Sequence, residues 1–348
     1  MKIHNDFTGG NILVKSIDRN VITLENELRD TLDWFYWAFC IEGAEGQELT
    51  FNMQSTRLGY WGPAVSHDLK SWQWLDSSDE NSFTYRFDED EPRVYFAHHM
   101  LYHPDRFYGF LAEHDIRADE LCKSRKGRSV PCVTLGEGEK SIILTARHHA
   151  CESAGSYVLE GVLRELIDDP IPNIRVFCVP FVDYDGVLDG DQGKGRIPHD
   201  HNRDYIDTPI YPEVAEIIKH ADLYGCHLGF DFHSPWHTGG ENDNIFIVRN
   251  RIDKQEQFDR FADFLQKELT AASISYTKEN DHPPMTGWNQ PSTNFGCTMN
   301  GREECDLAFT LETAYFGTES NKISTDMLIT LGRCFAKALK SYIGSKSQ

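Results

Sequence analysis

The feature that most constrains the fold is a change in the pattern of the chain near residue 115. Upstream of it, short runs rich in β-branched and aromatic residues alternate with turns of Gly, Asp, Asn and Ser. These runs are NILVKSI, VITLENEL, WFYWAFCI, LTFNMQ, FTYRF and RVYFAHHM, and each is typical of a strand. We therefore predict an antiparallel β-sandwich domain over residues 1–115.

Downstream of that point, apolar strands alternate with helices. The strand SIILTA (141–146) precedes a helix whose apolar residues recur at helical spacing, at Ala154, Val158, Val162 and Leu166. Further strands are predicted in IRVFCVPFV, LGFDFH and LAFTLE, and further helices in YPEVAEIIKHA, over residues 252–271 and at the C-terminus. The alternation predicts an α/β domain with a largely parallel or mixed sheet over residues 116–348. Ligand sites in such sheets lie beyond the carboxyl ends of the strands.

Charge and composition exclude several classes of partner. The net charge of −21 argues against a nucleic acid or an anionic membrane surface, either of which would be matched by a basic face. The longest apolar run, WFYWAFCI (34–41), is too short to cross a bilayer, and the first residues contain no apolar signal-peptide core. The nine cysteines lack C-x-x-C spacing, so we expect reduced thiols in a cytoplasmic protein. The oligomeric state is not indicated.

Residues of the type that bind metals follow the first strand of the α/β region. In ARHHACES (146–153), His148 stands four positions before Glu152 and His149 three positions before it. A catalytic zinc site needs imidazole nitrogens and a carboxylate that converge on one point and leave one position open. The H-x-x-E spacing alone is also typical of a capped helix with two solvent-facing histidines, so a third ligand is required.

Two further residues of this kind stand at strand ends. His233 closes the strand in GFDFHSP, and Glu312 takes the same place in AFTLETAYFG. A single histidine in this position is commonly structural, but its location at the same edge of the sheet makes it the candidate third ligand. Glu312 is flanked by apolar residues, where a carboxylate needs a partner or a chemical task. A glutamate next to a metal-activated water is the usual general base in metal-assisted hydrolysis.

The order of these motifs resembles that of the carboxypeptidase A-like zinc metallocarboxypeptidases. The segments ARHHACES, DYDGV (183–187), DHNRDY (200–205) and DFHS are similar to that family's A-R-x-H-P-G-E-S, N-P-D-G-V, D-L-N-R-N-Y and D-L-H. TLETAYFG resembles the segment around the catalytic glutamate, and KSRKGRSVP resembles G-x-S-x-x-G-R-x-I. FTGGNI, WFYWAFCIEG, LTFNM and VYFAHHMLY resemble the β-sandwich domain of the cytosolic carboxypeptidase subfamily. The resemblance covers nearly the whole chain.

The resemblance implies a mixed-sheet zinc carboxypeptidase-like catalytic domain, preceded by the β-sandwich, and assigns residue roles. His149, Glu152 and His233 would bind one zinc ion, while the role of His148 stays unassigned. Glu312 would act as the general base on the attacking water and pass the proton to the leaving amine.

The resemblance also implies which residues bind the substrate. Asn202 and Arg203 would hold the terminal carboxylate of a peptide or protein, a task suited to the guanidinium fork. A further cation should polarise the scissile carbonyl and stabilise the oxyanion. Arg196 in GKGRIPH is the candidate, and Lys194 remains open because the gap from Arg196 to Asn202 is shorter than usual in the family.

The chain departs from the family pattern at several positions. Ala150 and Cys151 replace the Pro-Gly of the H-P-G-E turn, Asp183 replaces an Asn, and His201 stands where an apolar residue is usual. None of these changes removes a ligand. Cys151 lies between two ligands, but its place in the H-x-x-E frame disfavours thiolate ligation. Tyr315 is either the tyrosine of the specificity pocket or a core residue.

The implied activity is removal of C-terminal residues, including acidic ones such as glutamate, from peptides or proteins. An acidic side chain would need a basic pocket, and Arg302 is the only obvious cation before the strand that holds Glu312. Three alternatives remain: an amidase acting on cell-wall peptides, an acylamino-acid hydrolase of the same fold without an N-terminal β domain, and a non-catalytic binding protein. In the β-sandwich, YWGPAVSHDLKSWQW either packs against the catalytic domain and shapes the cleft edge or forms a ligand-stacking surface.

Overall fold

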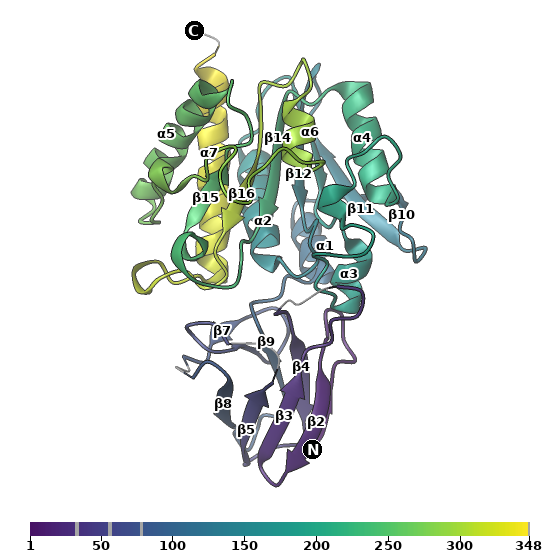
Figure 1. The fold of residues 1–348 in the computed structure, drawn as a ribbon, viewed down its shortest axis with the longest axis vertical. Coiled ribbons are helices and arrows are strands. Elements are labelled where there is room, and N and C mark those ends of the chain that lie inside the picture. Colours follow the sequence, from purple (N-terminus) through teal and green to yellow (C-terminus); the bar gives the residue numbers. More distant parts are fainter. Residues whose placement is uncertain (32–34, 55–57, 77–78, 347–348) are drawn as a thin grey trace.

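The computed structural model describes residues 1–31, 35–54, 58–76 and 79–346, and it consists of two lobes (Figure 1). In the N-terminal lobe, one sheet has the strand order β1 (Lys2–His4), β4 (Ala38–Glu42), β9 (Arg93–Ala97), β6 (Ala64–Ser66), β7 (Gln73–Trp74). The other sheet has the order β2 (Leu13–Asp18), β3 (Val21–Glu25), β5 (Glu48–Met53), β8 (Ser82–Arg86). A shared core rich in aromatic residues, including Phe39, Phe51 and Phe96, joins the two sheets, as expected of a sandwich.

The sandwich differs from the expectation in one strand pair. β3 and β5 are parallel, whereas the other pairs in these two sheets are antiparallel. The physical reason is that the chain leaves the sheet after β3, contributes β4 to the opposite sheet and returns to β5 in the original direction. The predicted strand at 34–41 begins only at Ala38, and its first residue lies outside the described residues.

The C-terminal lobe contains a mixed sheet, as the alternating pattern predicts. Its strand order is β10 (Asp119–Lys123), β11 (Ser129–Leu135), β13 (Ile174–Val179), β12 (Lys140–Ala146), β14 (Leu228–His233), β16 (Leu307–Thr313), β15 (Ile245–Val248). The four strands from β13 to β16 in this order are mutually parallel, and the three others pair antiparallel at the two edges.

Helices cover both faces of this sheet (Figure 1). One face packs against α2 (Ser153–Asp168), α5 (Gln255–Ala271) and α7 (Thr325–Gly344), and the other against α4 (Pro212–Tyr224) and α6 (Phe295–Asn300). Alternate residues of β12 serve the two cores: Ile142 and Leu144 belong to the first and Ile143 to the second. Burial on both faces explains why these central strands are continuous apolar runs in the sequence.

The predicted central elements match the structure closely, and the peripheral ones were missed. β14 has the predicted bounds, and the C-terminal helix buries its predicted face, Leu328, Leu331, Phe335, Leu339 and Tyr342. The long helix starts at Gln255, three residues later than predicted. The elements without a prediction of their own include α1 (Pro104–Glu113), α3 (Tyr184–Asp189), α6 and the edge strands β10, β11 and β15. These are short or amphipathic segments without a long apolar run.

The two lobes are held together by buried hydrogen bonds. Trp74 Nε1 donates to the carbonyl of Ile323 at 2.8 Å, and the side chain of Gln192 pairs with both backbone polar groups of Tyr36 at 2.7 Å.

The predicted boundary at residue 115 falls between α1 and β10 and stays a prediction, although α1 packs its apolar face into the same core as α2. None of the helices in the described part of the chain combines the length and hydrophobicity needed to cross a bilayer.

Strand register brings the candidate residues to one edge of the sheet. His233, the last residue of β14, is paired directly with Glu312 of β16, and β12 ends next to them at Ala146. α2 approaches β14 closely at Gly155, where a Cβ atom would lie only 2.3 Å from the Phe232 carbonyl oxygen. This close approach places the first turn of α2 beside the end of β14.

Candidate active site

Three buried side chains converge at this edge of the sheet. His149 lies in the turn after β12, Glu152 is the residue before α2, and His233 ends β14. Glu152 lies between the two histidines: its Oε1 is 2.8 Å from His149 Nδ1 and its Oε2 is 2.8 Å from His233 Nδ1. The structure therefore brings together the three residues that the sequence analysis names as metal ligands, within 4.8 Å of one another.

Two further carboxylates orient the histidine rings. His233 Nε2 lies 2.5 Å from Asp231 Oδ2, and His149 Nε2 lies 3.7 Å from Asp200 Oδ1. A ring whose Nε2–H faces a carboxylate presents its Nδ1 lone pair on the opposite side, the arrangement usual for metal-binding histidines. Two Nδ1 atoms and one carboxylate thus form a donor set that fits a divalent metal ion.

Buried charges in this cluster stabilise one another. Burial alone would lower the pKa of His233, but Asp231 and Glu152 outweigh it and hold that pKa well above its usual value. For Asp231, the two histidines His148 and His233 outweigh burial and lower the pKa. The imidazole proton at Nδ1 must leave when a metal binds, so metal affinity falls at acidic pH.

His148 has a different environment from His149. Its Nδ1 lies 2.9 Å from Asp231 Oδ1 and its Nε2 lies 2.8 Å from the Tyr205 hydroxyl, and the side chain is fully buried. Thr145 Oγ1 donates to the same Asp231 oxygen at 2.8 Å. Both ring nitrogens of His148 are therefore engaged, and the contact of its Nδ1 holds Asp231, which in turn orients His233.

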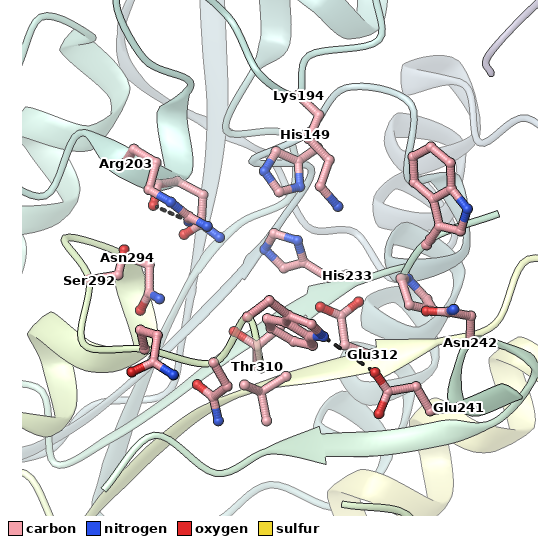
Figure 2. A pocket seen from close by; sticks show the side chains of 17 residues that line it. His149, Lys194, Arg203, His233, Glu241, Asn242, Ser292, Asn294, Thr310 and Glu312 are labelled. Atoms are coloured by element: carbon pink, nitrogen blue, oxygen red, sulfur yellow. Dashed lines mark hydrogen bonds between the residues drawn. The ribbon is translucent and has the colours of Figure 1, made fainter. Parts of the chain in front are cut away.

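Glu312 is a buried carboxylate at the edge of the cluster (Figure 2). Its Oε2 has no hydrogen-bond partner among the residues that the structure describes. Burial, reinforced by the charge of Glu152 and opposed by His233, raises the pKa of Glu312 to about 7. A carboxyl group in this state exchanges a proton readily near neutral pH.

Asn202 and Arg203 lie on the wall of the same pocket, in the short 3₁₀ helix His201–Arg203. Asn202 Oδ1 accepts from the Phe295 backbone N–H at 3.3 Å, and Arg203 Nη1 donates to the Asn202 carbonyl at 3.0 Å. The guanidinium of Arg203 projects into the pocket on the side where Asn294 lies (Figure 2).

Arg196 is not brought together with the other predicted residues. Its guanidinium pairs with Asp183 at 2.8 Å, with Asp191 at 3.0 Å and with Asp30 of the N-terminal lobe, and it does not line the pocket. Three carboxylates hold it behind the site. The alternative cation, Lys194, lines the pocket, and its Nζ lies 3.1 Å from Glu152 Oε1.

Two of the departures from the family pattern meet behind the pocket. His201 is buried, stacks on Tyr211 at 3.6 Å, and lies 3.8 Å from Asp183 Oδ2 and 3.9 Å from Glu213 Oε2. The substituted residues Asp183 and His201 thus lie in one polar cluster, which also engages Arg196. The turn residue Cys151 is 3.6 Å from the Tyr315 hydroxyl, and burial raises the pKa of its thiol to about 12. Tyr315 is a core residue that does not line the pocket.

The pocket has a volume of about 400 Å³ and a mixed polar and aromatic lining. Six of its lining residues were predicted from the sequence: His149, Lys194, Asn202, Arg203, His233 and Glu312. The other lining residues were not predicted: Pro235, Trp236, Glu241, Asn242, Val248, Trp288, Asn289, Gln290, Ser292, Asn294 and Thr310. Most of these come from the long connections after β14 and before α6, which carry no periodic signal. Only the polar, Trp- and Asn-rich composition of these loops hinted at a site.

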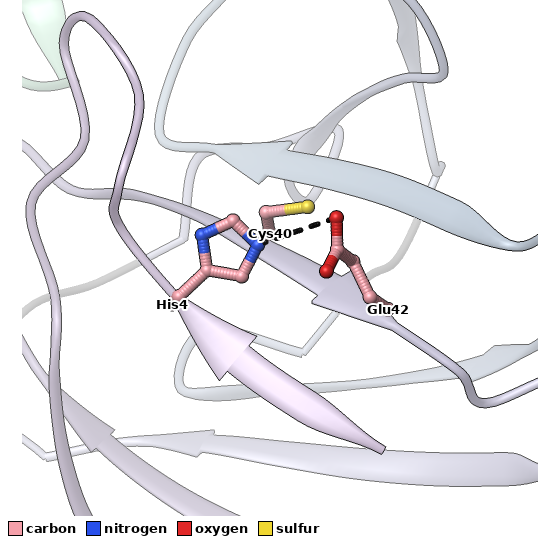
Figure 3. A group of neighbouring side chains, drawn as sticks. All are labelled: His4, Cys40 and Glu42. Carbon is pink, nitrogen blue, oxygen red and sulfur yellow. Dashed lines mark ion pairs between the residues drawn. The ribbon is translucent and has the colours of Figure 1, made fainter.

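A second group of ligand-type side chains lies in the N-terminal lobe (Figure 3). His4 of β1 is paired with Cys40 of β4, and His4 Nε2 lies 3.7 Å from Glu42 Oε1. Glu42 is also held by Arg93 at 2.7 Å, and burial, with the charge of Glu42, raises the pKa of the Cys40 thiol to about 12. Metal binding there would have to displace an arginine and ionise a thiol, so this group fits a metal less well than the cluster around Glu152.

Comparison with known proteins shows the family. No protein-family model matches the chain. A cytosolic carboxypeptidase 6 of Caenorhabditis elegans is 30% identical over 346 residues, covering 84% of this chain and 72% of the worm protein. An uncharacterised protein of Zymomonas mobilis is 28% identical over 314 residues, 81% of each chain. The crystal structure of a metallo-carboxypeptidase from Burkholderia cenocepacia has the same fold, with a TM-score of 0.81, 19% identity and 99% coverage of both chains. The chain therefore belongs to the cytosolic carboxypeptidase family and is a peptidase of the carboxypeptidase type.

Proposed function

We propose that the protein is a zinc-dependent carboxypeptidase that removes residues from the C-terminus of peptides or proteins. The observation that carries the proposal is one pocket lined by His149, His233, the buried Glu312 carboxyl and the Arg203 guanidinium, with the carboxylate of Glu152 held against the Nδ1 atoms of both histidines. Two imidazoles and one carboxylate, with room for substrate beside them, form the ligand set typical of catalytic zinc.

Each residue has a chemical task in this proposal. His149, Glu152 and His233 hold the ion, which when bound supplies Lewis acidity for the scissile carbonyl and for the attacking water. Glu312 accepts a proton from the water at its unpartnered Oε2 and then delivers it to the amine that leaves. Lys194, in place of Arg196, stabilises negative charge that develops on the carbonyl oxygen.

In this proposal the substrate is bound by Arg203, a cation on the wall of the pocket. A free C-terminal carboxylate is recognised by the two parallel N–H groups of Arg203, with the Asn202 amide beside it. This requirement restricts cleavage to the last peptide bond. Because acylamino-acid hydrolases of this fold are expected to lack an N-terminal β domain, the two N-terminal sheets favour the carboxypeptidase over that alternative.

The acidic preference implied by the family resemblance has less support. Arg302, the expected counterion, pairs with Asp222 and Glu304 at 2.8 Å each and does not line the pocket.

A cytoplasmic location is supported by the absence of disulfides among the nine cysteines and by relatives named as cytosolic.

Metal analysis together with a peptide panel tests this function. The purified protein should contain about one zinc ion per chain and should cleave peptides ending in free Glu, Lys, Phe or γ-linked residues, but not their C-terminal amides. Removal of the metal by a chelator should abolish cleavage, and zinc should restore it. Absence of bound metal together with no cleavage of any peptide would overturn the proposal.

A further inference from the structure

The wall of the pocket that contains Glu241 and Asn242 has no part in the chemistry proposed so far. Arg203 and Asn294 lie on one side, Glu241 and Asn242 lie on the other, and Thr310 and Glu312 lie between them (Figure 2). With the terminal carboxylate of a substrate on Arg203, as proposed above, the space bounded by Thr310 and Glu241 is left for the side chain of the last residue. The residues of that wall therefore face the substrate side chain.

Glu241 presents a fixed carboxylate to this space. Its Oε2 lies 2.9 Å from His282 Nδ1, and its Oε1 accepts from Trp288 Nε1 at 3.3 Å. The His282 and Trp288 rings stack at 4.5 Å, and His282 Nε2 lies 3.0 Å from the Thr286 carbonyl. The Glu241 side chain is 41% exposed, so its carboxylate is held in place and still open to a ligand.

The described residues around this space offer no unassigned cation to pair with an acidic side chain of the substrate. Among the lining residues that the structure describes, the cations are Lys194 and Arg203, and both have tasks at the reacting bond or the terminal carboxylate. The nearby Arg249 is held by Asp281 at 2.8 Å and Asp259 at 2.6 Å and does not line the pocket. His282, which contacts Glu241, does not line the pocket.

We propose that Glu241 is a specificity-determining residue and that the pocket selects a cationic terminal side chain, such as that of lysine or arginine. The proposal rests on the carboxypeptidase function above. A terminal ammonium or guanidinium gains an ion pair with Glu241, whereas a terminal glutamate meets a like charge. The other lining groups, Asn242, Asn289 and Thr310, are uncharged, so they tolerate a cation without competing for it.

Peptides that differ only in the last residue test the selection. The wild-type protein should give kcat/KM in the order Lys, then Gln, then Glu. Glu241→Gln should lower kcat/KM for the Lys peptide roughly two- to fivefold and raise it for the Glu peptide by a similar factor, the range for a partly exposed charge pair. Glu319→Gln removes one exposed glutamate outside the pocket and should leave the order and the ratios unchanged.

Binding separates this inference from the proposed function. In zinc-loaded Glu312→Gln, the dissociation constants of labelled peptides should rise from the Lys-terminated to the Gln-terminated to the Glu-terminated peptide. If no peptide is cleaved but the Lys peptide still binds more tightly, the proposed function fails and the selection stands. A Glu peptide that is cleaved or bound better than its Gln counterpart, or Lys-to-Glu ratios that Glu241→Gln leaves unchanged, would overturn the selection.

Discussion

At the scale of single residues, Glu312 is the buried carboxylate of the pocket whose Oε2 has no hydrogen-bond partner among the described residues. Glu152, by contrast, contacts both histidines. Replacing Glu312 with Gln keeps the shape and removes the proton acceptor. We expect kcat to fall roughly 10²- to 10⁴-fold, the usual contribution of a general base, with zinc content unchanged by elemental analysis. Unchanged turnover in Glu312→Gln would refute the assignment of the base.

Removing the charge of Lys194 should mainly lower kcat, whereas removing the charge of Arg196 should mainly lower stability. In Lys194→Met we expect kcat to fall roughly 10²- to 10³-fold, as for removal of one oxyanion-stabilising group, with little change in stability. In Arg196→Met, buried carboxylates including Asp183 lose their counterion, so the free energy of unfolding should fall by about 3–5 kcal/mol. Rates and urea unfolding of both variants check this. Loss of kcat in stably folded Arg196→Met would restore Arg196 as the catalytic cation.

At the scale of elements, the contact of α2 with β14 sets the position of Glu152 relative to His233. A Cβ at Gly155 would lie 2.3 Å from a β14 carbonyl oxygen, so Gly155→Ala should push α2 away from the strand. We expect a loss of about 1–3 kcal/mol in stability and weaker zinc binding. Gly109→Ala is the matched control, because Gly109 is an exposed glycine of α1 with open space around it. It should stabilise the protein by about 0.5–1 kcal/mol without changing zinc affinity.

The first turn of α4 carries a carboxyl that titrates abnormally. Burial, together with Asp183 and Asp185, raises the pKa of Glu213 from 4.5 to about 8. The folded state therefore holds this proton more tightly than the unfolded chain. Its contribution to stability is fully present below pH 4.5 and is lost as the pH rises through 8, at about 1.4 kcal/mol per pH unit between these values.

Urea unfolding between pH 5 and pH 9 measures this contribution. Glu213→Gln, which cannot ionise, should lose stability less steeply with rising pH than the wild type over the same interval. Equal slopes for the two proteins would show that Glu213 titrates normally in the folded state.

At the scale of the whole molecule, the N-terminal lobe supports the catalytic lobe and reaches the edge of its cleft. Tyr60 of the N-terminal lobe donates to Asp243, next to the pocket residue Asn242, at 3.0 Å. Trp74 Nε1 donates to a buried carbonyl of the segment before α7. Arg29, also in the N-terminal lobe, pairs with Asp191 at 2.6 Å, close to the loop that carries Lys194.

We therefore expect the two lobes to unfold together. Trp74→Phe keeps the ring but leaves the Ile323 carbonyl without its donor, which should cost about 1–3 kcal/mol. Circular dichroism and tryptophan fluorescence should report one coincident urea transition, shifted to lower concentration by this substitution. Separate transitions for the two probes would show that the lobes fold independently.

The sequence by itself determined the parts of this protein that depend on local pattern and chain order. Buried parallel strands must be apolar on both faces, so β12, β14 and β16 were visible as apolar runs. Strand ends must gather at one edge of the sheet, so His149, Glu152, His233 and Glu312 were predicted to meet.

Only the tertiary structure decided which cation faces the pocket and which residues line its far wall. Lys194 and Arg196 are two positions apart in one loop, and the carboxylates that draw Arg196 away come from distant segments, including Asp30 of the other lobe. Glu241 and Trp288 lie in separate loops, and they meet directly and through His282. Such contacts depend on loop paths that hydrophobic periodicity does not encode, because loops bury few apolar side chains.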